Sequence, residues 1–448
     1  MSNMPTNFTR YRSTDIYIKN ESTAWKGTDS GPTAPAGTDF FFAAEVPAMA
    51  QAGNYSDFSE VGNELITGRR VLNYVEYTAF DLVFYAKPDN GAGRQPAEHK
   101  ILKSFFGTES GVGGGTSVVY SFSNDIQTHS IWALQKGSTG KDARQVYCAA
   151  GSVPLSLSLA LAKDGPVTYT MGFQAPRIYY GGTTEVASSS YAGSTLTPII
   201  DAPVAYNGAT INAANSLFPN LPIGFYNGTS GALINDASGA GFPILTSSTS
   251  NGEVTINPGS DISSTVVDGV LLQPFLPAMD SGVPTMHGGS TTFKVLDQTD
   301  VSFFFGAGNT VAEGALFADA YKINATALNM DFDRGITTPA LTEMSGSAFA
   351  DANYVINELG ITGSATILCR PAEIPKLESI RRDPVKSIGI RIKSSDATIR
   401  FYAPAAHFEI PTISEADGVC QFEMSFTVVK GTKTADADKF KLTYIPTA

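Results

Sequence analysis

The chain has 448 residues, of which 16% are charged, and 42 acidic against 30 basic residues give a formal net charge of −12. That length allows two or three domains, and the acidic balance argues against a protein that holds nucleic-acid phosphates or anionic lipids by charge. The first residues do not form a signal peptide, and no run of about 18 apolar residues occurs, so we expect a soluble chain made in the cytoplasm without a membrane segment.

The first third of the sequence carries mostly sheet patterns. Residues 22–36 form an arm rich in Gly, Pro and Thr. Residues 71–87 (VLNYVEYTAFDLVFYAK) are rich in β-branched and aromatic residues, with apolar side chains at alternate positions. This pattern predicts one long strand or a bent pair of strands.

Residues 96–107 (PAEHKILKSFFG) predict a helix. Pro96 stands at its start, Glu98 in the first turn and Gly107 at the position of a C-terminal stop. The apolar residues between them fall on one face.

Two later segments predict β-hairpins. In residues 155–173, leucines alternate with small residues, Asp164 and Gly165 supply turn chemistry, and a second alternating run follows. In residues 388–401, isoleucines alternate with Gly and Arg on one side of an SSDAT turn, and Ile399 begins the return strand.

Residues 177–264 separate these regions and are rich in Gly, Ser, Thr, Asn and Pro without a helical period. The segment is too long for an ordinary loop. It is either a small all-β insertion or a set of long excursions from the body.

Residues 349–360 (FADANYVINELG) repeat the scheme of the first helix, with Asp351 early and Gly360 at the end, and predict a second helix of the same length. A shift of 253 residues without a gap superimposes the two segments. The same shift aligns Thr38 with Thr291, Phe40 with Phe293, Asp164 with Asp417, Gly165 with Gly418, Tyr169 with Phe422, Met171 with Met424 and Phe173 with Phe426. The sequence therefore indicates an internal duplication.

The cysteines and histidines, which are candidate catalytic or metal-binding residues, are scattered along the sequence. The cysteines, Cys148, Cys369 and Cys420, have no CxxC spacing and are interpreted as reduced, mostly buried thiols. The histidines, His99, His129, His287 and His407, have no metal-ligand spacing and are interpreted as surface or hydrogen-bonded core residues.

Two short motifs are also given structural interpretations. Residues 111–116 (GVGGGT) lack the Lys-Ser/Thr of a phosphate loop and follow the predicted helix, so they are interpreted as a loop. Asp331 and Asp333 could ligate a divalent cation but are more typical of a solvated strand edge or turn. We therefore predict no catalytic residue, no metal site, no cofactor and no enzymatic activity.

Five segments together resemble the duplicated tail-tube (major tail) proteins of long-tailed bacteriophages. They are STDIYIKNESTAWKGTDSG (13–31), PAEHKILKSFFG (96–107), LSLSLALAKDGPVTYTMGF (155–173), FADANYVINELG (349–360) and FEIPTISEADGVCQFEMSFTVVKG (408–431).

The resemblance implies a mainly β (α+β) chain with two similar β-sandwich-plus-helix tail-tube domains. The first would comprise residues 1–176 with the N-terminal arm, the second residues 267–448, and residues 177–266 would form the intervening Gly/Ser/Thr-rich segment or small all-β insertion. Six such domains, and hence three chains, would close a pseudo-hexameric ring, and arms such as residues 22–36 would bridge stacked rings.

The function implied is that of a structural virion protein, located in the tail, whose stacked rings conduct genomic DNA to the host. DNA would pass through the lumen without specific binding. The partners implied are further copies of the chain and the tape-measure, terminator and tail-tip proteins.

Two alternatives come from other classes of protein. One is another virion or surface β-protein, such as a capsid decoration, fibre or adhesin, which need not contain the duplication. The other is a carbohydrate-active β-sandwich enzyme, which would need paired carboxylates and exposed aromatic side chains. Trp25 and Trp132, the only tryptophans, do not suggest such a platform.

Overall fold

The structure of the chain is a computed structural model, which describes residues 14–21, 32–58, 69–88, 95–113, 116–135, 144–162, 165–200, 217–235, 241–247, 252–275, 300–306, 311–337, 354–394, 397–416, 418–429 and 440–446. Within these residues, 18 strands are linked by hydrogen bonds into one sheet system and seven others form a separate sheet. The prediction of a mainly β chain is confirmed.

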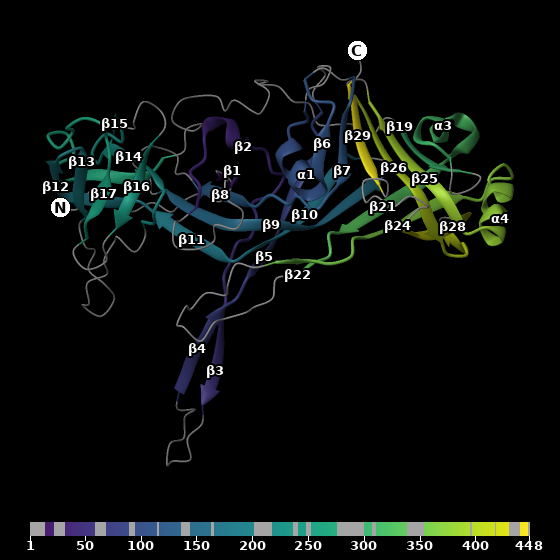
Figure 1. Cartoon of the computed structure of the whole chain (residues 1–448), viewed down its shortest axis with the longest axis horizontal. Coiled ribbons are helices and arrows are strands. Elements are labelled where there is room, and N and C mark those ends of the chain that lie inside the picture. The colour runs from purple at the N-terminus through teal and green to yellow at the C-terminus, as the bar shows by residue number, and fades with distance from the viewer. Residues whose placement is uncertain are drawn as a thin grey trace.

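The molecule is elongated (Figure 1). The seven-stranded sheet lies at one end, helix α4 (Ile374–Arg382) lies at the other, and a hairpin of β3 (Gly53–Phe58) and β4 (Arg69–Val75) projects from the middle. Among the described residues, no helix is long and apolar enough to cross a membrane.

The remaining elements of the first part of the chain are β1 (Thr14–Asn20), η1 (Gly37–Asp39), β2 (Phe40–Phe41), β5 (Thr78–Tyr85), α1 (His99–Phe106), β6 (Gly107–Ser110), β7 (Val118–Phe122), β8 (His129–Gln135), β9 (Gln145–Ala162), β10 (Thr168–Ala175) and β11 (Arg177–Gly182). The predicted hairpin at residues 155–173 is confirmed, because β9 and β10 pair antiparallel. The strand pattern of residues 71–87 is confirmed as two strands, β4 and β5.

Helix α1 confirms the prediction for residues 96–107, although its first helical residue is His99. Gly107 follows the helix with φ +94°, a conformation that favours glycine, and its N–H bonds back to the carbonyl of Lys103. The amphipathic pattern places Ile101, Leu102 and Phe105 in the core.

The later elements are β19 (Asp300–Phe305), α3 (Glu313–Leu316), η5 (Asp319–Tyr321), β20 (Lys322–Ile323), β21 (Ala325–Asp333), β22 (Ile336–Thr337), β23 (Val355–Ile356), β24 (Gly360–Leu368), α4, β25 (Val385–Lys393), β26 (Ala397–Phe408), β27 (Thr412–Ala416), β28 (Val419–Val428) and β29 (Lys441–Pro446). Strands β25 and β26 pair antiparallel, which confirms the hairpin predicted at residues 388–401.

The helix predicted at residues 349–360 is wrong. Residues 349–353 lie outside the described residues, and the rest of the segment contains β23 and the first residue of β24 instead of a helix. The physical reason is tertiary pairing: β-branched Val355 and Ile356 pair with β22, and this overrides a weak local helix preference. The longer of the two described α-helices in this half is α4, and it does not lie 253 residues after α1, so a uniform 253-residue offset does not relate the two halves.

The two halves nevertheless have the same order of strand pairings. Strand β8 lies between β1 and β9, and β25 lies between β19 and β26. A 3-10 turn and a two-residue strand, η1 with β2 and η5 with β20, lie beside β1 and β19. Helices α1 and α4 each follow a strand, β5 or β24, that pairs with β10 or β28 respectively.

The separate sheet consists of strands from the intervening segment together with β18, which lies beyond the predicted boundary at residue 266. Its strands are β12 (Thr184–Ala192), β13 (Thr195–Ile200), β14 (Pro222–Asn227), β15 (Leu233–Asn235), β16 (Phe242–Ser247), β17 (Val254–Ile256) and β18 (Val270–Pro274). Strand β11 instead pairs with β9 of the main sheet. The separate sheet packs on β8 through Trp132, whose ring lies 5.8 Å from that of Phe218.

Gly363 packs closely between β24 and its neighbours. A Cβ atom there would lie 2.4 Å from the Phe426 ring and 2.8 Å from the Asn329 carbonyl oxygen. We expect Gly363→Ala to lower the free energy of unfolding by about 1–3 kcal/mol, as overpacking does. Gly360→Ala, on the same strand with its nearest neighbour at 3.7 Å, should change it by less than about 0.5 kcal/mol. Denaturant titration of both variants checks this, and equal losses would contradict it.

Candidate functional site

Seven strands from both halves form one uninterrupted sheet in the order β5, β10, β9, β21, β24, β28, β27. The sheet joins the halves where β9 pairs with β21. One face packs on the core through residues such as Leu82, Met171, Leu157, Phe332 and Ile361. The other face is the candidate functional surface, and we name it the polar face.

Side chains on the polar face line up in rows across the strands. One row contains Val83, Thr170, Ser158, Asp331, Thr362 and Thr427. The next contains Tyr85, Thr168, Ala160, Asn329, Ser364 and Ser425. The polar face therefore consists mainly of hydroxyl-bearing and other small side chains.

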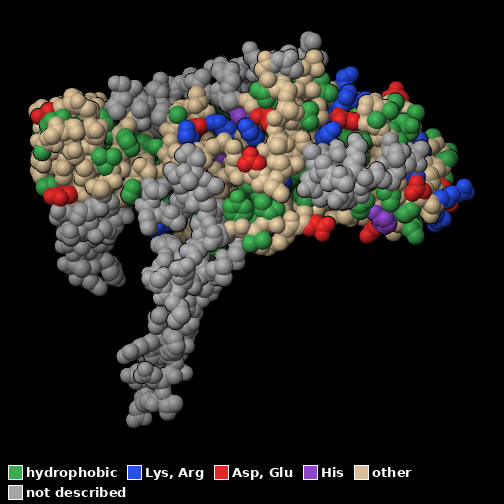
Figure 2. All heavy atoms as spheres, in the orientation of Figure 1, with side chains coloured by type: hydrophobic (Ala, Val, Ile, Leu, Met, Phe, Trp, Pro, Cys, Tyr) green, Lys and Arg blue, Asp and Glu red, His purple; other side chains and the backbone are tan. Residues whose placement is uncertain are grey.

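All charged residues that these seven strands place on the polar face are acidic. They are Asp81, Asp331, Asp333 and Glu423, and the described strands contribute no lysine or arginine to this face. The surface elsewhere differs, because Figure 2 shows lysine and arginine side chains in small groups with acidic side chains nearby. The polar face is thus a local concentration of negative charge.

Asp331 and Asp333 are both solvent-exposed on β21, which is paired on both sides. The interpretation as a strand edge or turn is wrong for Asp331, which lies within the sheet. Asp333 ends β21, and its carboxylate accepts a hydrogen bond from the N–H of Gly335 at 2.8 Å in the turn to β22. Ser158 donates a hydrogen bond to Asp331 at 2.6 Å. Across the described part of the chain, no group of three or more His, Cys, Asp or Glu side chains could hold a metal ion.

The histidines occupy different environments. His287 lies outside the described residues, and His407 is exposed. His99 is buried, and its Nδ1 lies 3.8 Å from Glu109. His129 is buried, and neither ring nitrogen has a hydrogen-bond partner among the described residues. The interpretation of core histidines as hydrogen-bonded is therefore wrong for His129, because its ring packs edge-on against Phe173 instead.

The cysteines are less buried than the sequence suggested. Cys148 is buried, but Cys369 is half-buried and Cys420 is exposed. The strand pairing of β24 with β28 brings the last two together, with their Sγ atoms 2.6 Å apart.

The glycine-rich motif and the arm are only partly described. Residues 111–113 follow strand β6, not the helix, and lie in the connection to β7. Of the arm, residues 22–31 lie outside the described part. The carbonyl of Thr33 accepts a hydrogen bond from the Trp132 indole at 3.1 Å, and Trp132 is fully buried, so it offers no platform for a sugar.

The first end of the continuous sheet lies at β5, which pairs with β10 and with no other described strand. Residues 42–50 run beside it, and the N–H of Ala44 donates to the carbonyl of Val83 at 2.7 Å. An open groove of about 630 Å³ lies here, lined by residues 14–16 and 40–46.

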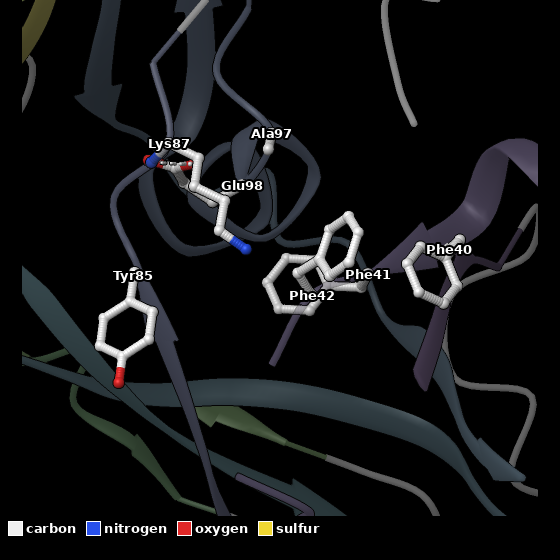
Figure 3. Close-up of a pocket in the computed structure, with 7 residues that line it drawn as sticks. All are labelled: Phe40, Phe41, Phe42, Tyr85, Lys87, Ala97 and Glu98. Carbon is white, nitrogen blue, oxygen red and sulfur yellow. Dashed lines mark hydrogen bonds between the residues drawn. The ribbon is translucent and has the colours of Figure 1, made fainter. Parts of the chain in front are cut away.

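Beside this groove, Phe42 is 42% exposed and its ring lies under the Lys87 ammonium at 4.3 Å (Figure 3). The backbone N–H of Lys87 donates to both carboxylate oxygens of Glu98, at 3.2 and 3.3 Å. Glu98 is completely buried and also accepts a hydrogen bond from the Tyr444 hydroxyl at 2.8 Å. Burial raises the pKa of Glu98 to about 7, although the Tyr444 hydrogen bond and the charge of Lys87 oppose the rise.

The second end of the sheet lies at β27, whose only partner among the described strands is β28. Two large apolar side chains are exposed here: Ile410 is 68% exposed and Ile413 71% exposed. An unpaired strand with exposed apolar side chains is a template for association. Sequence reasoning missed both ends, because only the fold shows which strands remain without a second partner.

The fold and these surfaces define a mainly β protein with a continuous sheet across both halves, a face on which the described strands place no cationic side chain, and a sheet end at β27 without a second described strand. No protein-family model matches the chain, and a search of curated proteins found no match.

Proposed function

We propose that this chain is the structural subunit of a bacteriophage tail tube, in which two β-sandwich-plus-helix units per chain allow three chains to close a pseudo-hexameric ring. Stacked rings would form the conduit for genomic DNA. The protein would then be located in the virion tail, have no enzymatic activity, and contact itself together with the tape-measure, terminator and tail-tip proteins.

The observation that carries the proposal is the polar face. A conduit for DNA must not bind phosphates, and a surface with carboxylates, hydroxyls and no cationic side chain repels them. Asp81, Asp331 and Asp333 lie on this face, which we assign to the lumen.

The size of the sheet is compatible with this role. Three chains would supply 21 strands, which at about 4.8 Å per strand give a circumference of about 100 Å and a backbone diameter of about 32 Å before strand tilt widens it. Such a ring is wide enough for a DNA duplex after side chains are added.

The repeated order of pairings supports the two-unit interpretation. A subunit with two similar units and a sheet end at each side would make head-to-tail contacts, and these close into a ring when the rotation per unit is about one sixth of a turn. The halves share one apolar core, in which the Phe106 and Phe332 rings lie 6.2 Å apart. This shared core links the two units within one chain.

A capsid decoration, fibre or adhesin remains the second candidate. The separate sheet of β12 to β18 favours it, because a module that packs outside the main sheet can serve as an attachment surface.

Electron microscopy and mass measurement of the full-length protein at high concentration test the proposal. We expect hollow rings of three chains or tubes, with or without added tail components, that do not retain duplex DNA at low salt. A protein that stays monomeric under all these conditions would contradict the tail-tube proposal, and solid fibres or rings that hold DNA tightly would favour the second candidate.

A further inference from the structure

Cys369 and Cys420 face each other on neighbouring strands. Cys369 directly follows β24 and Cys420 lies in β28, next to the paired residues Leu368 and Gln421. The backbone N–H of Cys369 donates to the carbonyl of Cys420 at 3.0 Å. The two Sγ atoms are in contact at 2.6 Å, and both cysteines are free thiols.

The antiparallel pairing gives the two cysteines a geometry that permits a disulfide. Directly opposite residues that share backbone hydrogen bonds have Cα atoms about 5.5 Å apart, and their side chains lie on the same side of the sheet. Disulfides join cysteines whose Cα atoms lie about 4.4–6.8 Å apart. The strands therefore hold the two thiols where a covalent bond needs little rearrangement of the backbone.

The pair lies at the end of β24, close to the surface. On the same side of the two strands, the neighbouring pair is Ile367 and Phe422, and Ile367 is fully buried in the core. Cys369 is half-buried and Cys420 is exposed. Figure 1 shows β24, β28 and α4 at the same end of the molecule. A dissolved reagent can therefore reach Cys420 while the sheet stays folded.

The thiols differ in how readily they can react. Partial burial, and then the hydrogen bond and charge of Cys420, raise the pKa of Cys369 to about 11 from 9. Because a thiol reacts as its thiolate, the exposed Cys420 meets a dissolved reagent first and Cys369 is placed to attack the product. Cys148 is fully buried, and burial holds the pKa of its thiol well above its usual range.

We propose that Cys369 and Cys420 form a reversible disulfide by exchange with a small-molecule disulfide, so that the pair is a redox-sensitive cross-link between β24 and β28. The cross-link can form whether or not the chain builds a tail tube.

The exchange takes place in two steps. The Cys420 thiolate attacks one sulfur of the small disulfide, the S–S bond of the reagent breaks, and one small thiol leaves. The Cys369 thiolate then attacks the Cys420 sulfur and displaces the second small thiol. The two cysteines lose two protons and two electrons, and the reagent takes them up as it becomes two thiols. An excess of a small thiol reverses both steps.

The cross-link responds to the surroundings of the protein. Cytoplasmic thiols keep an accessible pair reduced, whereas oxidising surroundings favour the disulfide. The two cysteines are 51 residues apart in the sequence, and the segment between them contains α4, β25, β26 and β27. Oxidation therefore closes this segment into a loop and restricts the unfolded chain, which stabilises the folded state.

Peptide mapping of the full-length protein tests the site. Reduced, folded protein is treated with oxidised glutathione, the remaining thiols are alkylated, and the digested chain is analysed by mass spectrometry. We expect one pair of peptides linked through Cys369 and Cys420, about 2 Da lighter than the two reduced peptides and without retained glutathione. Cys148 should be alkylated only after the protein is denatured.

Single substitutions separate the two steps. Cys369→Ser removes the second attack, so glutathione should remain on Cys420 as a stable mixed disulfide. Cys420→Ser leaves only the half-buried thiol, which should react with oxidised glutathione on the order of tenfold more slowly. Cys148→Ser is the matched control, and it should form the bond between Cys369 and Cys420 at the wild-type rate.

Thermal unfolding measures the effect of the bond. Oxidised wild-type protein should unfold about 4 °C above the reduced protein, because closure of the loop restricts the unfolded chain. The variant with both Cys369→Ser and Cys420→Ser should have the same midpoint with and without oxidised glutathione. An unchanged midpoint in wild-type protein that carries the bond would contradict the expected stabilisation.

The mapped product decides the proposal. A bond between Cys369 and Cys420 of one chain, reversed by an excess of small thiol, supports it. Wild-type protein in which these thiols retain glutathione, stay unreacted or link to other chains overturns it. Each of these results leaves the tail-tube proposal standing, because that proposal depends on assembly and is decided by electron microscopy and mass measurement.

Discussion

His129→Leu is expected to make the protein markedly more resistant to acid. The His129 ring is buried at the start of β8 and packs against Phe173, with centroids 6.2 Å apart. Burial, and secondarily the charge of Lys100, lowers the pKa of His129 to about 3 from an ordinary value of 6.5.

The sign of the pH dependence follows from the depressed pKa. The unfolded chain takes up a proton on this histidine near pH 6.5, but the folded chain does not until about pH 3. The contribution of neutral His129 is therefore complete above pH 6.5 and is lost as the pH falls toward 3, a total on the order of 5 kcal/mol.

Leucine has a similar volume and cannot ionise. The variant should match the wild type within about 1 kcal/mol at pH 8 and exceed its stability by about 3 kcal/mol at pH 4. Denaturant titrations at both pH values measure this. His407→Leu, at an exposed histidine, is the control, and an unchanged acid midpoint for His129→Leu would contradict the expectation.

Glu98→Gln is expected to stabilise the protein on the alkaline side of neutrality. The carboxyl group is completely buried, and burial raises its pKa to about 7 from 4.5. The folded state therefore holds this proton more tightly than the unfolded state. The contribution of the protonated carboxyl is complete below pH 4.5 and is lost as the pH rises through 7, a difference on the order of 3 kcal/mol.

Glutamine keeps an oxygen that can accept the Tyr444 hydrogen bond but carries no charge. The variant should equal the wild type near pH 4 and be more stable by up to about 3 kcal/mol at pH 8. Thermal unfolding across this range checks the result, with Glu358→Gln at an exposed position as control. A stability difference that does not change with pH would show that ionisation of Glu98 is not the cause.

Local patterns in the sequence predicted local elements. Alternating apolar residues and turn residues were sufficient to predict the β9–β10 and β25–β26 hairpins. The pattern from Pro96 to Gly107 was sufficient to predict helix α1. These elements are determined by contacts between residues close in the chain, which is the information that periodicity contains.

The remaining errors came from contacts between distant segments. Val355 and Ile356 form a strand because they pair with β22, and Gly360 begins β24, which pairs with β21. The burial of His129 depends on packing against β10. The pairing of β9 with β21, which defines the candidate surface, joins strands with no common local signal. The contact between Cys369 and Cys420 was also not predicted, because it depends on the pairing of two strands that are distant in the sequence.

The C-terminal strand β29 makes contacts with residues that are far away in the sequence. Strand β29 pairs with β7, and the hydrogen bond from Tyr444 to Glu98 spans 346 residues. Closing such distant contacts delays folding because loop entropy must be lost before they form. In the amino-terminal half, β7 therefore lacks its pairing with β29, and Glu98 lacks its hydrogen bond from Tyr444, until the C-terminal residues have been synthesised. During that interval its sheet ends are open to other chains, so rapid synthesis at high concentration favours aggregation and chaperone assistance becomes important.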